Sequence, residues 1–201
     1  SNFISKGTAI TVVEADEFDR SFLTLKPDIA CITSMDADHL DIYGDASALE
    51  ASFLAFADLV ANKNKLLHKK GLPLQGQSIA LEGTAAYQGK NIRIENGAYK
   101  FDFIAPEVTL RDMSFCLPGH HNLHNAVTAL SMAILAGAPT RLLKEALTKF
   151  KGVARRFSYR IRTDNLVLID DYAHHPTELD ALHQGVSEMY PDDQKLIVFQ
   201  P

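Results

Sequence analysis

The 201-residue sequence lacks several features that define major protein classes. It has no tryptophan and only two cysteines, Cys31 and Cys116, so a disulfide-rich scaffold and a cysteine-based metal site are excluded. No apolar run approaches the ~18 residues that a membrane-spanning helix needs. The first 21 residues do not have the pattern of a secretory signal peptide. We therefore expect a cytoplasmic protein with no membrane partner, in which both thiols are reduced and buried.

Composition and charge narrow the class further. The chain is 46% hydrophobic and 22% charged, as in ordinary globular proteins, which excludes disorder, collagen and coiled coil. The net charge is −5, and residues 1–60 hold 11 acidic side chains against three basic ones. This balance argues against nucleic acid as a main partner. Acidic residues at this density form either a solvated surface or a site that gathers a divalent cation.

The first part of the chain has the pattern of an α/β protein. Runs of β-branched residues at 8–15 and 29–34 predict strands that are buried on both faces. The apolar spacing at 46–60 then predicts a helix, which Asp45 can cap. We therefore expect a parallel sheet flanked by helices.

From residue 73 to residue 118, short alternating segments predict a small antiparallel subsheet. Asn96-Gly97 lies between two of these segments and favours a type I′ hairpin turn. Two helices follow. The one at 121–137 is strongly apolar and is expected to be buried, and Thr140 is expected to cap the next.

The chain is expected to divide into residues 1–151 and residues 152–201. In the second part we predict two strands around a turn at 164–165, a helix at 177–189 and a strand at 196–200. A unit of about fifty residues is too small to cover both faces of its sheet. The second domain is therefore expected to be incomplete.

Six of the eight histidines lie in three short clusters, at His39, at residues 120–124 and at residues 174–175. Polar clusters at the strand ends of an α/β sheet are where ligands bind in such folds. If the first two predicted strands are neighbours, Glu14 and His39 meet at one edge of the sheet. Oxygen and imidazole ligands of this kind suit Mg²⁺ or Mn²⁺. The alternative is that the aspartates around them only cap helices.

The second cluster begins a helix and contains His121, Asn122 and Asn125. The three-residue spacing places both asparagines on one helix face, where their amides can pair with the edge of a base. The same asparagines could simply cap the helix. The spacing alone leaves both interpretations open.

The third cluster places Arg156 before one predicted strand and Asp171 after the next. Arginine suits bidentate contact with a transferring phosphoryl group, and a carboxylate can accept from a ribose hydroxyl. The alternative is a structural ion pair between Arg156 and Asp171. Adjacent His174 and His175 point in different directions and no third ligand is evident, which argues against a zinc hydrolase.

Five motifs, in this order, resemble those of the Mur ligases of peptidoglycan synthesis: VVEADEFDRSF, DADHLDIYG, PGHHNLHNAVTA, GVARRF and DDYAHHPTEL. The second and third motifs alone would indicate only the wider superfamily, which includes folylpolyglutamate synthases. The first and last are most similar to the members that join L-alanine to UDP-N-acetylmuramate, or to relatives that join a tripeptide to it. The resemblance covers nearly the whole chain and is weakest at about 63–117.

The resemblance implies an activity and a set of residue roles. Family members use ATP and Mg²⁺ to phosphorylate the muramate carboxylate, and the amine of L-alanine then attacks the acyl phosphate to form an amide. By motif, Glu14 and His39 would hold metal ions, and His39 and Arg156 would act at the phosphates. The residues that would contact ATP are His121, Asn122, Asn125, Arg156 and Asp171. Those that would lie near the incoming amino acid are Tyr172, His174 and His175.

The sequence also departs from the family pattern. Family members have three domains and a glycine-rich GxxGKT/S loop, which this sequence does not contain. The resemblance thus implies that residues 1–151 are part of a central ATPase domain. Residues 152–201 would begin a Rossmann-like, amino-acid-binding C-terminal domain. A piece of this extent is expected to be inactive alone, and a non-catalytic nucleotide-binding module is a further interpretation.

Overall fold

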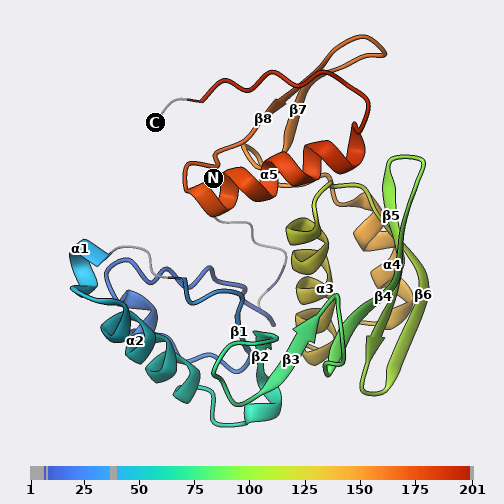
Figure 1. The fold of residues 1–201 in the computed structure, drawn as a ribbon. Helices are drawn as coiled ribbons and strands as arrows, with labels where there is room; N and C mark the ends of the chain where they lie inside the picture. Colours follow the sequence, from blue (N-terminus) through green and yellow to red (C-terminus); the bar gives the residue numbers. More distant parts are fainter. Residues whose placement is uncertain (1–6, 8, 37–39, 200–201) are drawn as a thin grey trace.

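A computed structural model describes residues 7, 9–36 and 40–199 of the chain (Figure 1). A sheet with helices packed against it occupies most of the molecule, and the last part of the chain forms a smaller unit above it. None of the helices in the described part is long and apolar enough to cross a bilayer.

The main sheet has six strands in the order β1-β2-β3-β4-β5-β6. Their bounds are Ala30–Ile32, Leu66–Lys69, Gln77–Ala80, Tyr87–Glu95, Ala98–Ala105 and Val108–Phe115. Strands β1 to β4 pair in parallel, and β4 to β6 pair antiparallel. The predicted α/β class is confirmed. The antiparallel region is continuous with the parallel one, however, and β3 belongs to the parallel part although it lies within 73–118.

The hairpin between β4 and β5 turns as the sequence predicts. Asn96 and Gly97 have φ angles of 52° and 70°, the left-handed conformation that a type I′ turn requires at both positions. Both pairings of β5 are irregular, because the register shifts between Lys90 and Arg93 where β4 pairs with β5, and between Phe101 and Phe103 where β5 pairs with β6.

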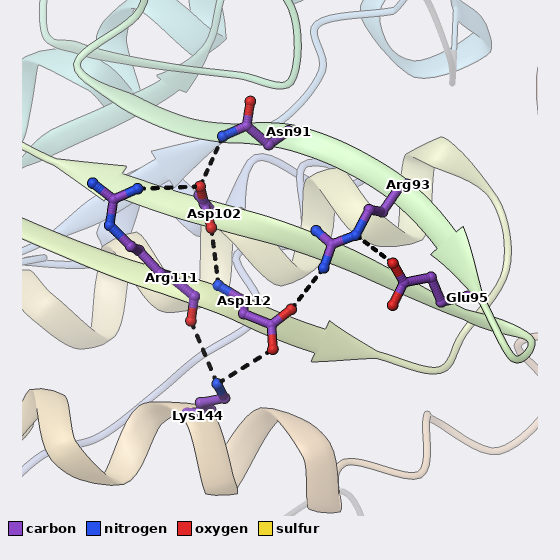
Figure 2. Close-up of polar contacts among 7 residues, drawn as sticks. All are labelled: Asn91, Arg93, Glu95, Asp102, Arg111, Asp112 and Lys144. Atoms are coloured by element: carbon purple, nitrogen blue, oxygen red, sulfur yellow. Dashed lines mark hydrogen bonds and ion pairs between the residues drawn. The ribbon is translucent and has the colours of Figure 1, made fainter.

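Polar side chains hold these irregular strands together (Figure 2). Asp102 accepts hydrogen bonds from the Asp112 backbone N–H at 2.9 Å and from the Asn91 side chain at 2.8 Å, and these bonds lower the pKa of its carboxyl group. Arg93 bridges Glu95 at 2.6 Å and Asp112 at 2.9 Å. The network ties β4 and β6 to β5 at the positions where the register of both pairings shifts.

The core lies between this sheet and the helices α3 (His120–Leu135) and α4 (Thr140–Lys149). Alternate side chains of β5, Tyr99, Phe101 and Phe103, are fully buried against Leu123 and Val127 of α3. The expectation that this helix is buried is confirmed. The expectation that Thr140 caps α4 is wrong, because extended Pro139 occupies the cap position and Thr140 is already helical.

Helix α2 (Ala46–Asp58) packs its own small core around Phe22 and Phe56, next to β1. Asp45 caps it as predicted, accepting a hydrogen bond from the Ala48 backbone N–H at 2.8 Å. The short helix α1 (Leu40–Tyr43) precedes α2 in the chain. The same part of the chain contains two 3₁₀ turns, Ser21–Thr24 and Lys63–Lys65.

Replacing Asp45 with alanine is expected to lower the free energy of unfolding by about 1 kcal/mol, because it leaves an amide of the first turn without its acceptor. Urea unfolding followed by circular dichroism measures this change. Asp58→Ala removes a carboxylate from the last turn, where it pairs with Lys63 at 3.0 Å with 82% of its side chain exposed. That variant should change stability by less than about 0.5 kcal/mol. Equal losses in both variants would show that the cap is not the cause.

The smaller unit contains β7 (Ser158–Arg162), β8 (Val167–Asp170) and α5 (Pro176–Met189). The two strands pair antiparallel around the predicted turn, and the predicted helix is present.

Two predicted strands are not formed. Residues 9–15 and 196–199 are irregular, and Val12 and Val198 are 84% and 91% exposed. A β-branched run becomes a strand only when a neighbour takes up its backbone hydrogen bonds. In the described sheet, β1 instead pairs with β2, and no strand pairs with either run.

The two cysteines are free, but the expectation of burial is only partly correct. Cys31 is half-buried in β1, and this burial raises the pKa of its thiol to about 12. Cys116 is exposed because it follows the last residue of β6 and leaves the core.

Candidate functional site

A cavity of about 340 Å³ lies where the carboxyl end of β1 faces the start of α5. Its polar lining comes from both parts of the molecule: Thr33, Ser34 and Asp36 follow β1, and His175, Thr177 and Glu178 begin α5. Clefts at the carboxyl ends of parallel strands are the usual ligand sites of α/β folds. The structure thus brings the residues at and after the end of the strand predicted at 29–34 next to His175 of the third cluster.

The start of α5 is fixed by a reciprocal cap. His175 is the capping residue, and its Nδ1 accepts from the Thr177 backbone N–H at 3.4 Å. Glu178 reaches back and accepts from the backbone N–H groups of His174 and His175 at 3.1 and 3.4 Å. His175 therefore uses Nδ1 for structure, which leaves Nε2 for a ligand.

Glu178 also holds Arg156. The Arg156 guanidinium donates from Nη1 to Glu178 Oε1 at 3.1 Å, and about half of the arginine side chain remains exposed. Partial burial of Glu178 opposes its ionisation, but the hydrogen bonds from His174, Arg156 and His175 outweigh it and lower its pKa. Arg156 is thus held next to Glu178, which lines the cavity, and its exposed N–H groups can meet an anion.

This lowered pKa predicts a pH dependence of stability. A carboxyl group whose folded pKa lies below its ordinary value of 4.5 adds stability above that value, and this stability is lost as the pH falls through the folded pKa. Glu178→Gln should therefore be less stable than the native chain at pH 7, and the difference should shrink below about pH 4.5. Melting temperatures between pH 7 and pH 3 measure this. Glu145→Gln, on an exposed pair with Lys149, is the control and should give parallel curves. A constant gap for Glu178→Gln would contradict the assignment.

Asp171 binds backbone groups and does not pair with Arg156. Its two oxygens accept from the N–H groups of Phe157 at 2.6 Å and Ala173 at 2.8 Å. The alternative interpretation of an Arg156–Asp171 ion pair is therefore wrong. Phe157 is buried and has a φ of 46°, a conformation that costs on the order of 1–3 kcal/mol in a non-glycine residue. Asp171 helps to hold this strained loop, which aims Arg156 at Glu178.

Helix α3 begins close to the same residues. Asn122 donates to the Pro118 carbonyl at 2.7 Å, so part of its amide serves the helix start, whereas Asn125 is exposed. Burial of one side of the His121 ring lowers its pKa, with the Asp171 and Glu188 carboxylates opposing this shift and Arg156 adding to it. The second and third clusters are therefore brought together.

The remaining site residues of the third cluster lie at the surface. Tyr172 is 51% exposed, and Arg155 stacks over its ring at 4.5 Å. The His174 ring lies 5.2 Å from that of Tyr172 and 3.6 Å from the Glu178 carboxylate. The side chains of Tyr172 and His174 are thus accessible to a ligand in the segment between β8 and α5.

The predicted metal pair stays untested. Glu14 is exposed in an irregular segment, although its neighbours Ala15 and Glu17 line the cavity, and His39 lies outside the described residues. Within the described ranges, no three His, Cys, Asp or Glu side chains are grouped so as to hold a metal ion. The described residues alone therefore do not form a complete metal site.

Sequence reasoning missed Glu178, which joins the helix cap to Arg156. A signal was present, since an acidic residue three positions after a capping residue is typical of a helix start and Pro176 marks the first turn. What the sequence does not contain is that the same carboxylate also faces an arginine 22 residues earlier.

An α/β sheet, a cleft between two units and an arginine near two helix starts form an arrangement that is suited to binding phosphorylated ligands. Comparison with protein families gives the particular family. Residues 1–133 match the model described as the Mur ligase middle domain, and residues 155–201 match the Mur ligase, glutamate ligase domain. The chain belongs to the Mur ligase family.

Individual relatives agree with this assignment. The UDP-N-acetylmuramate--L-alanine ligase of Flavobacterium psychrophilum is 57% identical over 201 residues, which are 100% of this chain and 45% of that protein. The crystal structure of MurC from Thermotoga maritima superposes with a TM-score of 0.74 at 22% identity, over 89% of this chain and 42% of that one. MurF from Thermotoga maritima in complex with ADP gives 0.63 at 17% identity, over 80% and 39%. The two structures show a shared fold, and the chain spans less than half the length of the curated relative.

Proposed function

We propose that this chain is part of an ATP-dependent ligase that joins L-alanine to UDP-N-acetylmuramate in the cytoplasm. The observation that carries the reaction class is the position of Arg156, which pairs with Glu178 in the lining of the cleft between the two units and lies near the starts of α3 and α5. The chain-long identity to a relative named for L-alanine supports the choice of substrates. The related MurF structure with ADP supports an adenine nucleotide as the cofactor.

The geometry suggests how the chain would serve this reaction. Arg156 would turn its exposed N–H groups to the γ-phosphate, where a planar guanidinium stabilises the charge of the transferring group. Asp171 would accept from a ribose hydroxyl, since a carboxylate has acceptor positions beyond the two that hold backbone amides. His121, Asn122 and Asn125 would lie on the adenine side.

The other reactants would meet at the open side of the cleft. Tyr172, His174 and His175 would lie near the L-alanine amine, with His175 offering Nε2 because Nδ1 caps α5. Glu14 and His39 would be the protein ligands of Mg²⁺, which neutralises phosphate charge when it is bound. The fit of the metal depends on His39, so this part rests on the motif and not on a described contact.

Phosphate release from ATP by the full-length protein tests the proposal. UDP-N-acetylmuramate is present throughout, and L-alanine or a tripeptide is added separately. Release that requires L-alanine supports the proposed ligase. Release only with the tripeptide would assign the protein to the peptide-recycling reaction, and nucleotide binding with no release in either case would favour a non-catalytic module.

A further inference from the structure

Tyr99 joins three elements through one buried hydroxyl group. Its side chain lies in β5 and is fully buried. The hydroxyl donates to Glu188 in α5 and accepts from the Gly119 backbone N–H, the residue before α3, at 3.1 Å. Burial, followed by the Glu188 carboxylate, raises the pKa of this tyrosine, so the hydroxyl remains a donor at neutral pH. One hydroxyl therefore connects the main sheet, the start of α3 and the smaller unit.

His120 adds a second contact at the same place. Its Nε2 lies 3.7 Å from the other oxygen of Glu188, and its ring stands nearly perpendicular to that of Tyr99 at 6.0 Å. Glu188 is 31% exposed, so water can hydrate it if the tyrosine hydroxyl is lost. Removal of one partner should thus weaken the junction without leaving a fully buried charge.

Two glycines allow the backbones to meet at this junction. α5 passes over the start of α3 (Figure 1), and a Cβ added at Gly185 would lie 3.0 Å from the Gly119 Cα and 3.2 Å from its N. These contacts are tighter than nine in ten real Cβ contacts, so a larger residue at 185 requires the Gly119 backbone to give way by a few tenths of an ångström. On the other side of Gly119, the His121 ring occupies the space that a Cβ would fill. The backbone at Gly119 therefore lies against both Gly185 of α5 and the His121 ring.

We infer that Tyr99 and Glu188 are a positioning pair, which couples the docking of α5 to the geometry of the α3 start and so to nucleotide binding. This inference rests on the proposed function for its kinetic consequence. Neither side chain needs to touch the nucleotide. They act through Gly119, which precedes His121 and Asn122 by two and three residues.

Kinetics of the full-length protein with ATP varied test the coupling. Tyr99→Phe and Glu188→Ala are each expected to raise the KM for ATP on the order of tenfold, as for a lost hydrogen bond to a charged group, while kcat changes less than about twofold. Tyr190→Phe is the matched control. It loses the same atom at the end of α5, but its hydroxyl contacts Tyr159 at 3.2 Å within the smaller unit, so KM should be unchanged.

The double variant separates coupling from two independent structural losses. If the pair acts as a unit, Tyr99→Phe combined with Glu188→Ala raises KM no more than either change alone. A multiplied effect of about a hundredfold would overturn the inference, as would a KM unchanged in a folded Tyr99→Phe protein. Gly185→Ala should raise KM similarly, although alanine favours the interior of a helix.

Hydrogen exchange supplies a readout that does not need activity. Glu188→Ala should speed exchange of the amides at 119–123 in α3, a separate element, and leave those of α2 unchanged. Faster exchange throughout the protein, or none at 119–123, would overturn the coupling. If the native protein does not consume ATP with L-alanine, the proposed function fails, and the exchange result still decides whether the pair positions α3.

Discussion

Replacing Arg156 with alanine in the full-length protein is expected to lower kcat/KM for ligation by about 10²- to 10³-fold. Removal of one positioned donor to a developing negative charge has this magnitude in other enzymes. Arg156 is suited to such a role because a strained loop and Glu178 hold it beside the cleft with half of its side chain exposed. Arg156→Lys should recover only part of the rate, because an ammonium group lacks the planar pair of donors.

Arg160→Ala is the matched control. Arg160 lies four residues further along and donates to Asp170 at 2.7 and 3.2 Å, on the exposed surface of the β7–β8 hairpin. Its loss should leave the rate within about twofold of the native value, as expected for an exposed pair. Equal losses in both variants would mean that charge near the hairpin, and not Arg156 itself, supports turnover.

Glu178→Ala decides between a direct and a structural role of Arg156. If the arginine only anchors α5, removal of its partner should lower activity as much as removal of the arginine. If it contacts the transferring phosphate, Glu178→Ala should be the milder change, since the guanidinium is kept. Steady-state rates of phosphate release for Arg156→Ala and Glu178→Ala, with folding checked by circular dichroism, distinguish these cases.

The sequence predicted the features that depend on nearby residues better than those that depend on residues far away in the chain. The Asn96-Gly97 turn, the Asp45 cap and helix α3 depend on neighbours within a few residues, and all three are confirmed. The strand predicted at 8–15 is not formed over the described residues 9–15, because it depended on long-range partners. A buried strand is defined by partners elsewhere in the chain, which its own composition does not reveal.

Strand β2 is a further element that the sequence pattern did not reveal. It was not predicted, and it pairs in parallel with β3 although only residues 70–76 connect them. Parallel neighbours normally need a crossover of a dozen residues or more, so a sequence reading favours a turn to an antiparallel partner there. The convergence of Arg156, Glu178 and His121 is likewise a product of the fold. The resemblance implied roles for Arg156 and His121 but none for Glu178, although Glu178 lies within the last motif.

The sheet that supports the cleft depends most on the buried face of β5. Phe101→Ala is expected to lower the free energy of unfolding by about 3–5 kcal/mol, because it removes a fully buried ring and the surrounding strands cannot close the space. The ring faces the region of Gly89, where an added Cβ would lie 3.6 Å from it.

Urea unfolding of the 201-residue chain measures the loss of stability. The control is Ile94→Ala, at a position 44% exposed on β4, which should cost less than about 1 kcal/mol. A loss below 1 kcal/mol for Phe101→Ala would show that this face is not the main source of stability. Since Tyr99 lies two residues before Phe101 on the same face, a destabilised β5 should also loosen the start of α3.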